Sequence, residues 1–298
     1  MHWSKILKKA LVLGSTGLLG SHVVNVLKST YTVSGTNHRN QPTSGIESFK
    51  IDASGFDDLE QLIINKDFDL VINCIGLTNI EECELRPEAA WQINATLPFY
   101  LAKATLRSGA KLIHISTDHF YSELESPRSE EVNFTPVNHY GYSKIAGERF
   151  VIETNPSALV LRTNFFGISK ESNHSLLDFL VGKILSSEKI VGFNDVIFNP
   201  IGVSELSRLI LTLADLSLAG IFHTAGQNPI SKYEFAVLVG KGLQKPTEAI
   251  SQGSAESSQI RVNRPKYLAL DGSKLWGQLG INPPSIEFML SQELKNII

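Results

Sequence analysis

Short apolar segments alternate with helix-length amphipathic segments along the first half of the chain, and this order restricts the fold more than any single motif. Several of the short segments, such as LVINCI and LIHIS, are apolar on both faces, which is typical of parallel strands between two helical layers. The order predicts an α/β fold with a Rossmann-type doubly wound parallel sheet. The predicted strands are Ala10–Leu13, Thr32–Gly35, Ser48–Ile51, Leu70–Cys74, Lys111–Ser116 and Ala158–Arg162, and the helices between them are Leu18–Ser29, Asp57–Asn65, Pro87–Ser108 and Tyr140–Glu153.

The second half of the chain is less regular and predicts a smaller C-terminal lobe beyond the sheet. We expect residues 1–163 to form the sheet domain, to which residues 200–226 return, and residues 164–199 and 227–298 to form the lobe. Residues 251–267 are polar and turn-rich, which favours a loop over a binding site. The predicted elements are helices at Ser175–Ser186, Val203–Leu216, Ser231–Gly242 and Asp271–Leu279, the last with Asp271 as its N-cap, and a strand at Gly220–Gly226.

A glycine-rich stretch, GSTGLLG, follows the first predicted strand and begins the first predicted helix. Gly14, Gly17 and Gly20 are spaced G-x-x-G-x-x-G. Between a strand and a helix, such glycines permit a tight turn, a close approach of the backbone to a diphosphate, and close packing of helix on strand. The N-terminus of the helix also attracts anions. The stretch therefore predicts a pyrophosphate site, and its further candidate contacts are Thr16, Leu18 and Leu19.

The end of the second predicted strand indicates which dinucleotide is bound. A site for NAD usually carries an acid here to bind the ribose hydroxyls, but this chain reads Asn37-His38-Arg39. An arginine can pair with the 2′-phosphate of NADPH, whereas an acid would repel it. We therefore expect NADPH to be preferred over NADH, with Arg39 at the phosphate and Asp52 and Ala53 at the adenine.

A possible reactive pair lies at the start of the predicted helix Tyr140–Glu153. Tyr140 and Lys144 are four residues apart, so they share one helix face. A neighbouring ammonium lowers the pKa of a tyrosine, which then exchanges a proton with a carbonyl or alcohol more readily. Thr117 and Asp118 follow a buried predicted strand, and strand C-termini are where open α/β sheets bind ligands. The glycine stretch, the Thr117-Asp118 strand end and the Tyr140/Lys144 pair are therefore expected at one edge of the sheet.

In this combination the chain resembles the extended short-chain dehydrogenase/reductases, and among them the dTDP-4-dehydrorhamnose reductase family. The resemblance covers nearly the whole chain. The matching stretches are GSTGLLGSHV, NCIGLTNIEECE, STDHF, YGYSKIAGE, VLRTNFFG, GIFHTAGQNPISKYEFA and NRPKYLALDGSKL. It implies an NADP-binding sheet domain, a substrate-binding lobe and NADPH-dependent reduction of the C4 keto group of a nucleotide-linked 4-keto-6-deoxyhexose. Such a reaction belongs to dTDP-rhamnose and cell-surface polysaccharide biosynthesis.

The resemblance also implies roles for individual residues. Tyr140 is implied to donate a proton to the C4 oxyanion, and Lys144 to lower the pKa of that tyrosine and hold the ribose. Thr117 is implied to hydrogen-bond the C4 oxygen, and Asp118 to bind a sugar hydroxyl or orient the site. The further contacts implied are Ile75, Gly76 and Thr78 for the cofactor, and Thr78, Ile80, Asn164, Phe165, Asn199 and Arg264 for the substrate.

Departures from the family pattern bear on the alternatives. His119 follows Asp118 where an aromatic residue is usual, and Phe165 stands where the family often carries tryptophan. Ser15 follows Gly14 in place of an acidic metal contact, so no metal is expected. A 4,6-dehydratase usually has Thr-Asp-Glu where this chain has His119 third, and a 4-epimerase normally lacks the aspartate. The remaining alternative is a non-catalytic NADP-binding regulatory subunit of this fold.

Composition excludes several other classes of function. The net charge is −3 and no basic stripe is present, so nucleic-acid binding has no electrostatic support. No apolar run approaches the ~20 residues of a membrane span. The two cysteines have no disulfide or metal spacing, which favours a reduced, cytoplasmic protein. A homodimer that uses the Tyr140 helix is an expectation from fold analogy alone.

Overall fold

A seven-stranded parallel sheet forms the centre of the molecule. The computed structural model describes residues 7–38, 41–51, 55–120, 127–133, 135–169, 175–257, 262–295 and 297. The strand order is β11-β6-β5-β4-β1-β2-β3, which confirms the predicted doubly wound sheet and puts its switch point between β1 and β4. The strands are β1 (Lys8–Leu13), β2 (Tyr31–Asn37), β3 (Glu47–Lys50), β4 (Leu70–Asn73), β5 (Lys111–Ile115), β6 (Leu159–Thr163) and β11 (Gly220–Thr224).

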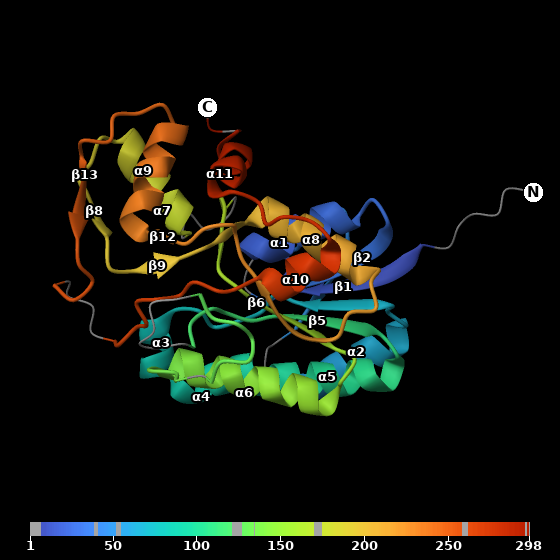
Figure 1. Ribbon diagram of the computed structural model, residues 1–298. Coiled ribbons are helices and arrows are strands. Elements are labelled where there is room, and N and C mark those ends of the chain that lie inside the picture. The colour runs from blue at the N-terminus through green and yellow to red at the C-terminus, as the bar shows by residue number, and fades with distance from the viewer. Residues whose placement is uncertain are drawn as a thin grey trace, which may run out of the picture.

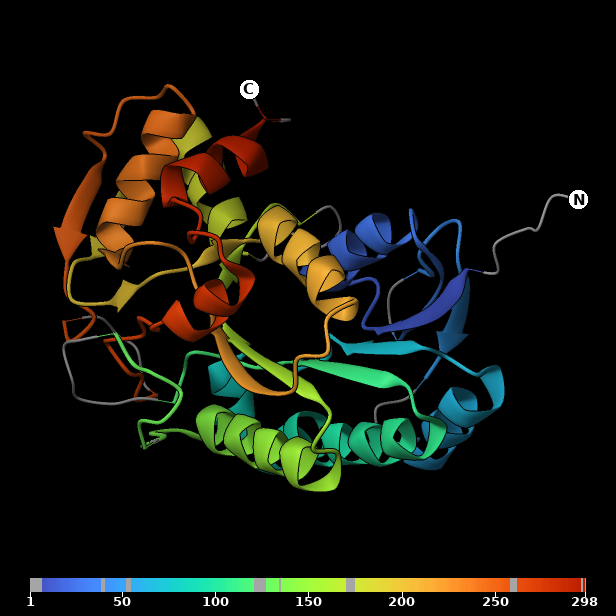
Figure 2. The ribbon, with the colours of Figure 1, turned by 45° about the vertical axis from the view of Figure 1, so that its right-hand side comes forward.

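Helices cover both faces of this sheet (Figures 1 and 2). On one face lie α1 (Leu18–Leu27), α8 (Val203–Ala214) and α10 (Ser273–Leu279). On the other lie α2 (Phe56–Lys66), α5 (Leu97–Ser108) and α6 (His139–Thr154). The single helix expected over residues 87–108 is instead three joined pieces, because a π-helical turn interrupts it. These pieces, preceded by α3 (Ile80–Leu85), are α4 (Pro87–Trp91), η1 (Gln92–Thr96) and α5.

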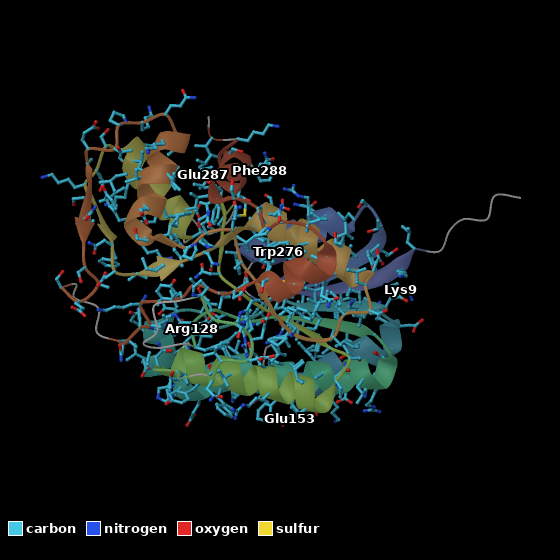
Figure 3. All side chains as sticks on the ribbon, viewed as in Figure 1. Lys9, Arg128, Glu153, Trp276, Glu287 and Phe288 are labelled. Carbon is cyan, nitrogen blue, oxygen red and sulfur yellow. The ribbon has the colours of Figure 1, made fainter. Side chains whose placement is uncertain are left out.

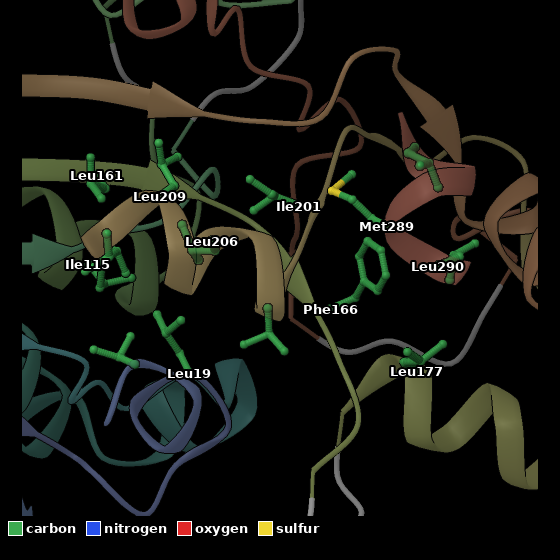
Figure 4. Packing of buried hydrophobic residues seen from close by; sticks show 14 of the residues in the cluster. Leu19, Ile115, Leu161, Phe166, Leu177, Ile201, Leu206, Leu209, Met289 and Leu290 are labelled. Carbon is green, nitrogen blue, oxygen red and sulfur yellow. The ribbon is translucent and has the colours of Figure 1, made fainter. Parts of the chain in front are cut away.

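Alternating strand residues supply two hydrophobic cores, one on each face of the sheet. In β1, Ala10 and Val12 belong to the core beneath α1 and α8, and Leu11 and Leu13 to the core beneath α2 and α5. This alternation explains why the strands are apolar at every position. The first core continues into the lobe through Phe166 (Figure 4).

The lobe consists of short strand pairs and three helices that pack on the first core. The pairs are β7 (Phe165–Phe166) with β10 (Ile201–Gly202), β8 (Ile190–Phe193) with β13 (Ile250–Gly253), and β9 (Ile197–Phe198) with β12 (Ile230–Ser231). The helices are α7 (Leu176–Leu185), α9 (Lys232–Gly242) and α11 (Ile286–Leu294). Because one hydrophobic core joins sheet and lobe, the division into domains at residue 163 stays a prediction.

The α10 helix is hydrogen-bonded to the segment directly after β11. Trp276, labelled in Figure 3, donates its indole N–H to the Ala225 carbonyl oxygen at 3.1 Å. The N-cap of α10 is Gly272 and not Asp271 as expected. Asp271 lies one residue earlier, and its carboxylate accepts the Ser273 N–H at 2.9 Å. The expectation for Asp271 is therefore wrong by one position.

Candidate active site

The turn between β1 and α1 requires glycine at two positions. Gly14 has φ +73°, a left-handed conformation that other residues rarely adopt. A Cβ on Gly20 would lie 2.1 Å from the Gly14 carbonyl oxygen, so only glycine lets the first turn of α1 pack against the strand end. The exposed Gly17 has open space in front of it apart from the Gly14 oxygen at 3.4 Å. The turn thus leaves room for a ligand at the N-terminus of a ten-residue helix.

A cavity of about 520 Å³, here called the cofactor cavity, extends from this turn. Gly14, Thr16 and Gly17 line one end. The rest of the wall comes from the carboxyl ends of β2, β3 and β4 and from residues of α2, α3, α4, η1 and α5. These residues fit a dinucleotide, because they supply a glycine turn, a helix N-terminus and an apolar slot beside Ile51. The predicted contacts Arg39, Asp52 and Ala53 lie outside the described residues.

A second cavity, of about 250 Å³ and here called the reaction cavity, shares Cys74, Ile75 and Gly76 with the cofactor cavity. The shared segment follows β4, so the two cavities meet at the switch point of the sheet. The structure brings ten of the predicted site residues together here. They are Leu19, Ile75, Gly76, Thr78, Thr117, Asp118, Tyr140, Lys144, Asn164 and Phe165.

Two buried hydroxyl groups of the reaction cavity lack a hydrogen-bond partner among the described residues. They are Ser116 Oγ and Thr163 Oγ1. A buried polar atom without a partner costs free energy, and groups of this kind concentrate where a ligand completes the hydrogen bonding. The two hydroxyls therefore support the fit of a polar ligand to this cavity.

The N-terminal part of α6 is held in place by two asparagines. Asn138 caps the helix, since its side chain accepts the Gly141 N–H at 2.9 Å. Asn94, in the π-helical turn η1, accepts the Leu77 N–H at 2.9 Å and donates to Leu77 O at 3.0 Å. The same amide lies 3.1 Å from Ser143 Oγ on α6. Asn94 thus joins the segment after β4 to the helix of Tyr140, a contact that the sequence analysis missed.

The reactive pair behaves differently from the expectation that Lys144 lowers the pKa of Tyr140. Burial raises the pKa of Tyr140 above its ordinary value, and a hydrogen bond with Thr117 only partly opposes this. Lys144 Nζ instead donates to the Ile115 carbonyl oxygen at 2.9 Å. Burial lowers the pKa of Lys144 to about 8, and the nearby Glu148 carboxylate opposes the change. In the described state, Tyr140 is therefore a protonated phenol.

Asp118 is held by its neighbours from two sides. Asn164 Nδ2 donates to Asp118 Oδ2 at 2.7 Å, and Thr117 Oγ1 donates to Oδ1 at 3.3 Å. Burial raises the pKa of Asp118 to about 6 despite these hydrogen bonds and the charge of Lys232. The carboxyl group can therefore accept or donate a hydrogen bond to a ligand near neutral pH.

His119, a departure from the family pattern, packs against the reactive tyrosine. Its ring lies 5.5 Å from the Tyr140 ring, centroid to centroid, in an edge-on arrangement. Its Nε2 lies 3.1 Å from Asn138 Nδ2, so the neutral imidazole accepts from the amide. Burial lowers the pKa of His119 to about 4. An uncharged ring that fixes the orientation of Tyr140 replaces the usual aromatic residue.

A third cavity, of about 760 Å³ and here called the substrate cavity, lies between the sheet edge and the lobe. Ile80, Asn164 and Arg264 line it as predicted for substrate contacts, and Asn164 also lines the reaction cavity. The walls on the lobe side come from α7, β8 and α9. The arrangement joins the reaction cavity, where the candidate reactive side chains lie, to a wider space on the lobe side.

Three predicted contacts line none of the three cavities, namely Leu18, Gly20 and Asn199. Asn199 lines none of these cavities, because its amide is used on backbone: Nδ2 donates to Leu270 O at 2.8 Å and Oδ1 accepts from Leu270 N at 2.9 Å. Phe165, a predicted substrate contact, lines the reaction cavity and not the substrate cavity. Leu18 packs against the hydrophobic core and lines no cavity described above.

Comparison with known proteins identifies the family. The model of the RmlD substrate binding domain matches residues 8–297. The chain belongs to this family. It is an oxidoreductase that resembles the extended short-chain dehydrogenase/reductases in its sheet and motifs.

Three similar proteins show the range of this likeness. The "Probable low-salt glycan biosynthesis reductase Agl14" of Haloferax volcanii is 30% identical over 283 residues, which cover 93% of this chain and 94% of that protein. Methionine adenosyltransferase 2 subunit beta of Mus musculus is 28% identical over 277 residues, 90% of this chain and 81% of that one. A crystal structure of dTDP-4-dehydrorhamnose reductase from Bacillus anthracis in complex with NADP has a TM-score of 0.86 at 24% identity, and covers 97% of this chain and 99% of that one. This last likeness shows the fold.

The part of the chain that the structure describes contains neither a membrane-spanning helix nor a cluster of metal-ligating side chains. Within the described ranges, no helix has both the length and the apolar character needed to span a bilayer. No group of three or more His, Cys, Asp or Glu side chains there could hold a metal ion.

Proposed function

We propose that the protein reduces the C4 keto group of a nucleotide-linked 4-keto-6-deoxyhexose with NADPH. The observation that carries this proposal is the reaction cavity, where Tyr140, Thr117, Asp118 and Lys144 meet between the cofactor cavity and the substrate cavity. A carbonyl bound in it lies next to a phenol donor and next to the space for a dinucleotide. The names of the similar reductases support the same reaction class.

Each of the four residues has a separate role in the proposed reduction. When bound, the reduced nicotinamide supplies a hydride to the C4 carbon of the sugar. Tyr140 donates its phenolic proton to the C4 oxygen, so the carbonyl becomes a hydroxyl and both added hydrogens are accounted for. With substrate bound, Thr117 turns its single hydroxyl proton from Asp118 Oδ1 to the same C4 oxygen. Lys144 holds the nicotinamide ribose and stabilises the phenolate that remains. Asp118, oriented by Asn164, binds a hydroxyl of the sugar ring.

The cofactor cavity accounts for the dinucleotide part of the proposal. The Gly14–Gly20 turn holds the pyrophosphate, with Thr16 beside it, and Ile75 and Gly76 flank the path to the nicotinamide. We keep the proposal that Arg39 binds the 2′-phosphate and that Asp52 and Ala53 meet the adenine.

Consumption of NADPH with a panel of nucleotide-linked 4-keto-6-deoxyhexoses tests the proposal. We expect the wild type to consume NADPH only with such a substrate, and Tyr140→Phe to lose about a hundred-fold or more of kcat while NADPH still binds. A wild-type protein that binds NADPH and reduces no member of the panel contradicts the proposal.

That negative result would favour a second candidate, a non-catalytic NADP-binding regulatory subunit. The 28% identity to methionine adenosyltransferase 2 subunit beta over 90% of this chain favours this alternative. The two candidates separate in the Tyr140→Phe variant, because a regulatory role requires cofactor binding and not the proton.

The wider setting follows from the proposed reaction. A reductase of this kind acts in dTDP-rhamnose biosynthesis and so in cell-surface polysaccharide biosynthesis. A cytoplasmic location and a homodimer that uses α6 stay predictions.

A further inference from the structure

Lys232 lines the substrate cavity and interacts electrostatically with Asp118 of the reaction cavity. It is the first residue of α9, directly after the N-cap Ser231, and it lines the substrate cavity together with His119 and Asn164. Its Nζ lies 3.3 Å from the centroid of the Phe198 ring. Asn164 lines both cavities and donates to Asp118, so the ammonium group faces the sugar-binding end of the site.

Among the residues that the structure describes, no carboxylate is in direct contact with the charge of Lys232. Two other cations line the same cavity, but Arg264 pairs with Glu81, and Lys266 pairs with Glu256 and with Asp195. Within the described part of the chain, no ion pair of 4.0 Å or less involves Lys232. Burial lowers the pKa of Lys232 to about 8, and Asp118 is the anion that opposes this change.

A partly buried cation in this setting is costly unless an anion completes it. Asp118 does so only in part, since its oxygens accept from Asn164 and Thr117 instead. An anionic group of a ligand that reaches the junction of the cavities would supply what is missing. Lysine acts on phosphate as a compact point charge.

The shape of the proposed substrate determines which of its anionic groups lies next to Lys232. In a pyranose ring, C1 and C4 are at opposite ends. With C4 beside Tyr140 in the reaction cavity, the ring extends past Asp118 and Asn164, and C1 emerges towards the substrate cavity. The phosphate attached to C1 therefore arrives next to the side chain at the start of α9.

We propose that Lys232 binds the sugar-linked phosphate of the substrate, and that it thereby selects glycosyl nucleoside diphosphates over uncharged sugars and nucleoside monophosphates. This inference rests on the proposed function, because it takes the position of C4 from it. The glycine turn and the reactive pair give no indication of a phosphate contact at Lys232, because neither motif lies on the lobe.

Calorimetric titration of dTDP and dTMP in the presence of NADP⁺ tests the inference without turnover. The second phosphate of dTDP stands for the sugar-linked phosphate. We expect Lys232→Met to weaken dTDP binding about ten- to a hundred-fold, the range for loss of a hydrogen bond to a charged group. Binding of dTMP should change less than about two-fold, and Lys232→Arg should retain part of the affinity for dTDP.

Lys274→Met provides the matched control. Lys274 Nζ also lies over an aromatic ring, 4.4 Å from the centroid of Phe222, but it lines none of the three cavities. Its removal should leave both affinities unchanged. An unchanged affinity of Lys232→Met for NADP⁺ shows that this variant is folded.

Each outcome decides the inference. Equal losses for dTDP and dTMP, no loss for either, or no binding of dTDP to the wild type would overturn it. A selective loss of dTDP binding in a protein that reduces no 4-keto sugar supports the phosphate contact and contradicts the proposed reduction. Reduction by the wild type together with unchanged dTDP binding in Lys232→Met contradicts the inference alone.

Discussion

The buried ion pair between α6 and β6 offers a quantitative test of how the reactive helix is held. Glu148 and Arg162 have side-chain exposures of 1% and 0%, and Arg162 donates to both carboxylate oxygens at 2.8 to 3.0 Å. Glu148 lies one turn after Lys144 on α6. The pair therefore fixes the helix that carries Tyr140 and Lys144 to β6, which lies between β11 and β5 in the sheet and contributes Thr163 to the reaction cavity.

Replacement of one partner should cost far more than the pair itself contributes. Glu148→Leu removes the carboxylate that accepts three hydrogen bonds from the buried Arg162 guanidinium, which also lies 3.3 Å from His223 Nε2 and 5.4 Å from the centroid of the Phe120 ring. We expect a loss of about 3–5 kcal/mol in the free energy of unfolding, the range for removal of one partner from a buried ion pair. Glu148→Gln retains one acceptor and should lose about 1–3 kcal/mol.

Urea denaturation followed by circular dichroism measures these losses. The control is Glu205→Leu, which breaks the exposed pair of Glu205 with Arg208 on α8 and should cost at most about 1 kcal/mol. If Glu148→Leu and Glu205→Leu lose the same small amount, the pair is not the anchor of α6 and the reasoning is refuted.

Two further predictions concern the cofactor turn and the lysine. Gly20→Ala puts a Cβ 2.1 Å from Gly14 O, so NADP⁺ affinity measured by fluorescence titration should fall at least about ten-fold. The control Gly277→Ala, whose Cβ meets nothing within 4 Å, should leave the affinity unchanged. Equal affinities of the two variants would show that the turn tolerates a side chain. Burial lowers the pKa of Lys144 from 10.5 to about 8 while Glu148 raises it, so the ammonium is lost above about pH 8 and kcat/KM should fall there. In Glu148→Gln this alkaline fall should move to lower pH, and a limb that stays in place would contradict the link between the two side chains.

The sequence was sufficient for the features that local patterns determine. Apolar runs such as Leu70–Asn73 predict buried parallel strands because both faces of the sheet are covered, and the structure confirms the sheet. Gly14 and Gly20 were identifiable because each has a separate steric reason at a strand–helix junction. Tyr140 and Lys144 were placed by helical spacing alone.

The remaining features depend on contacts between distant segments, which no local pattern contains. Lys232 looks like an ordinary residue at the start of a capped helix, and only the packing of β9 and β12 brings it near Asp118. Asn94 lies within what reads as one continuous helix, and its side chain finds Leu77 and Ser143 only after folding. The expected substrate contact of Asn199 was wrong for the same reason, because the backbone of Leu270, which binds its amide, lies 71 residues further along the chain.

Transfer of deuterium tests the central claim most directly. The protein is incubated with NADPH that carries deuterium at the transferable position of the nicotinamide and with a dTDP-linked 4-keto-6-deoxyhexose, and the product is analysed by proton NMR. The account predicts one deuterium at C4 of the sugar for the wild type, and about a hundred-fold less labelled product in the same time for Tyr140→Phe. Product without deuterium at C4, or an unreacted substrate in the presence of tightly bound NADPH, would contradict it.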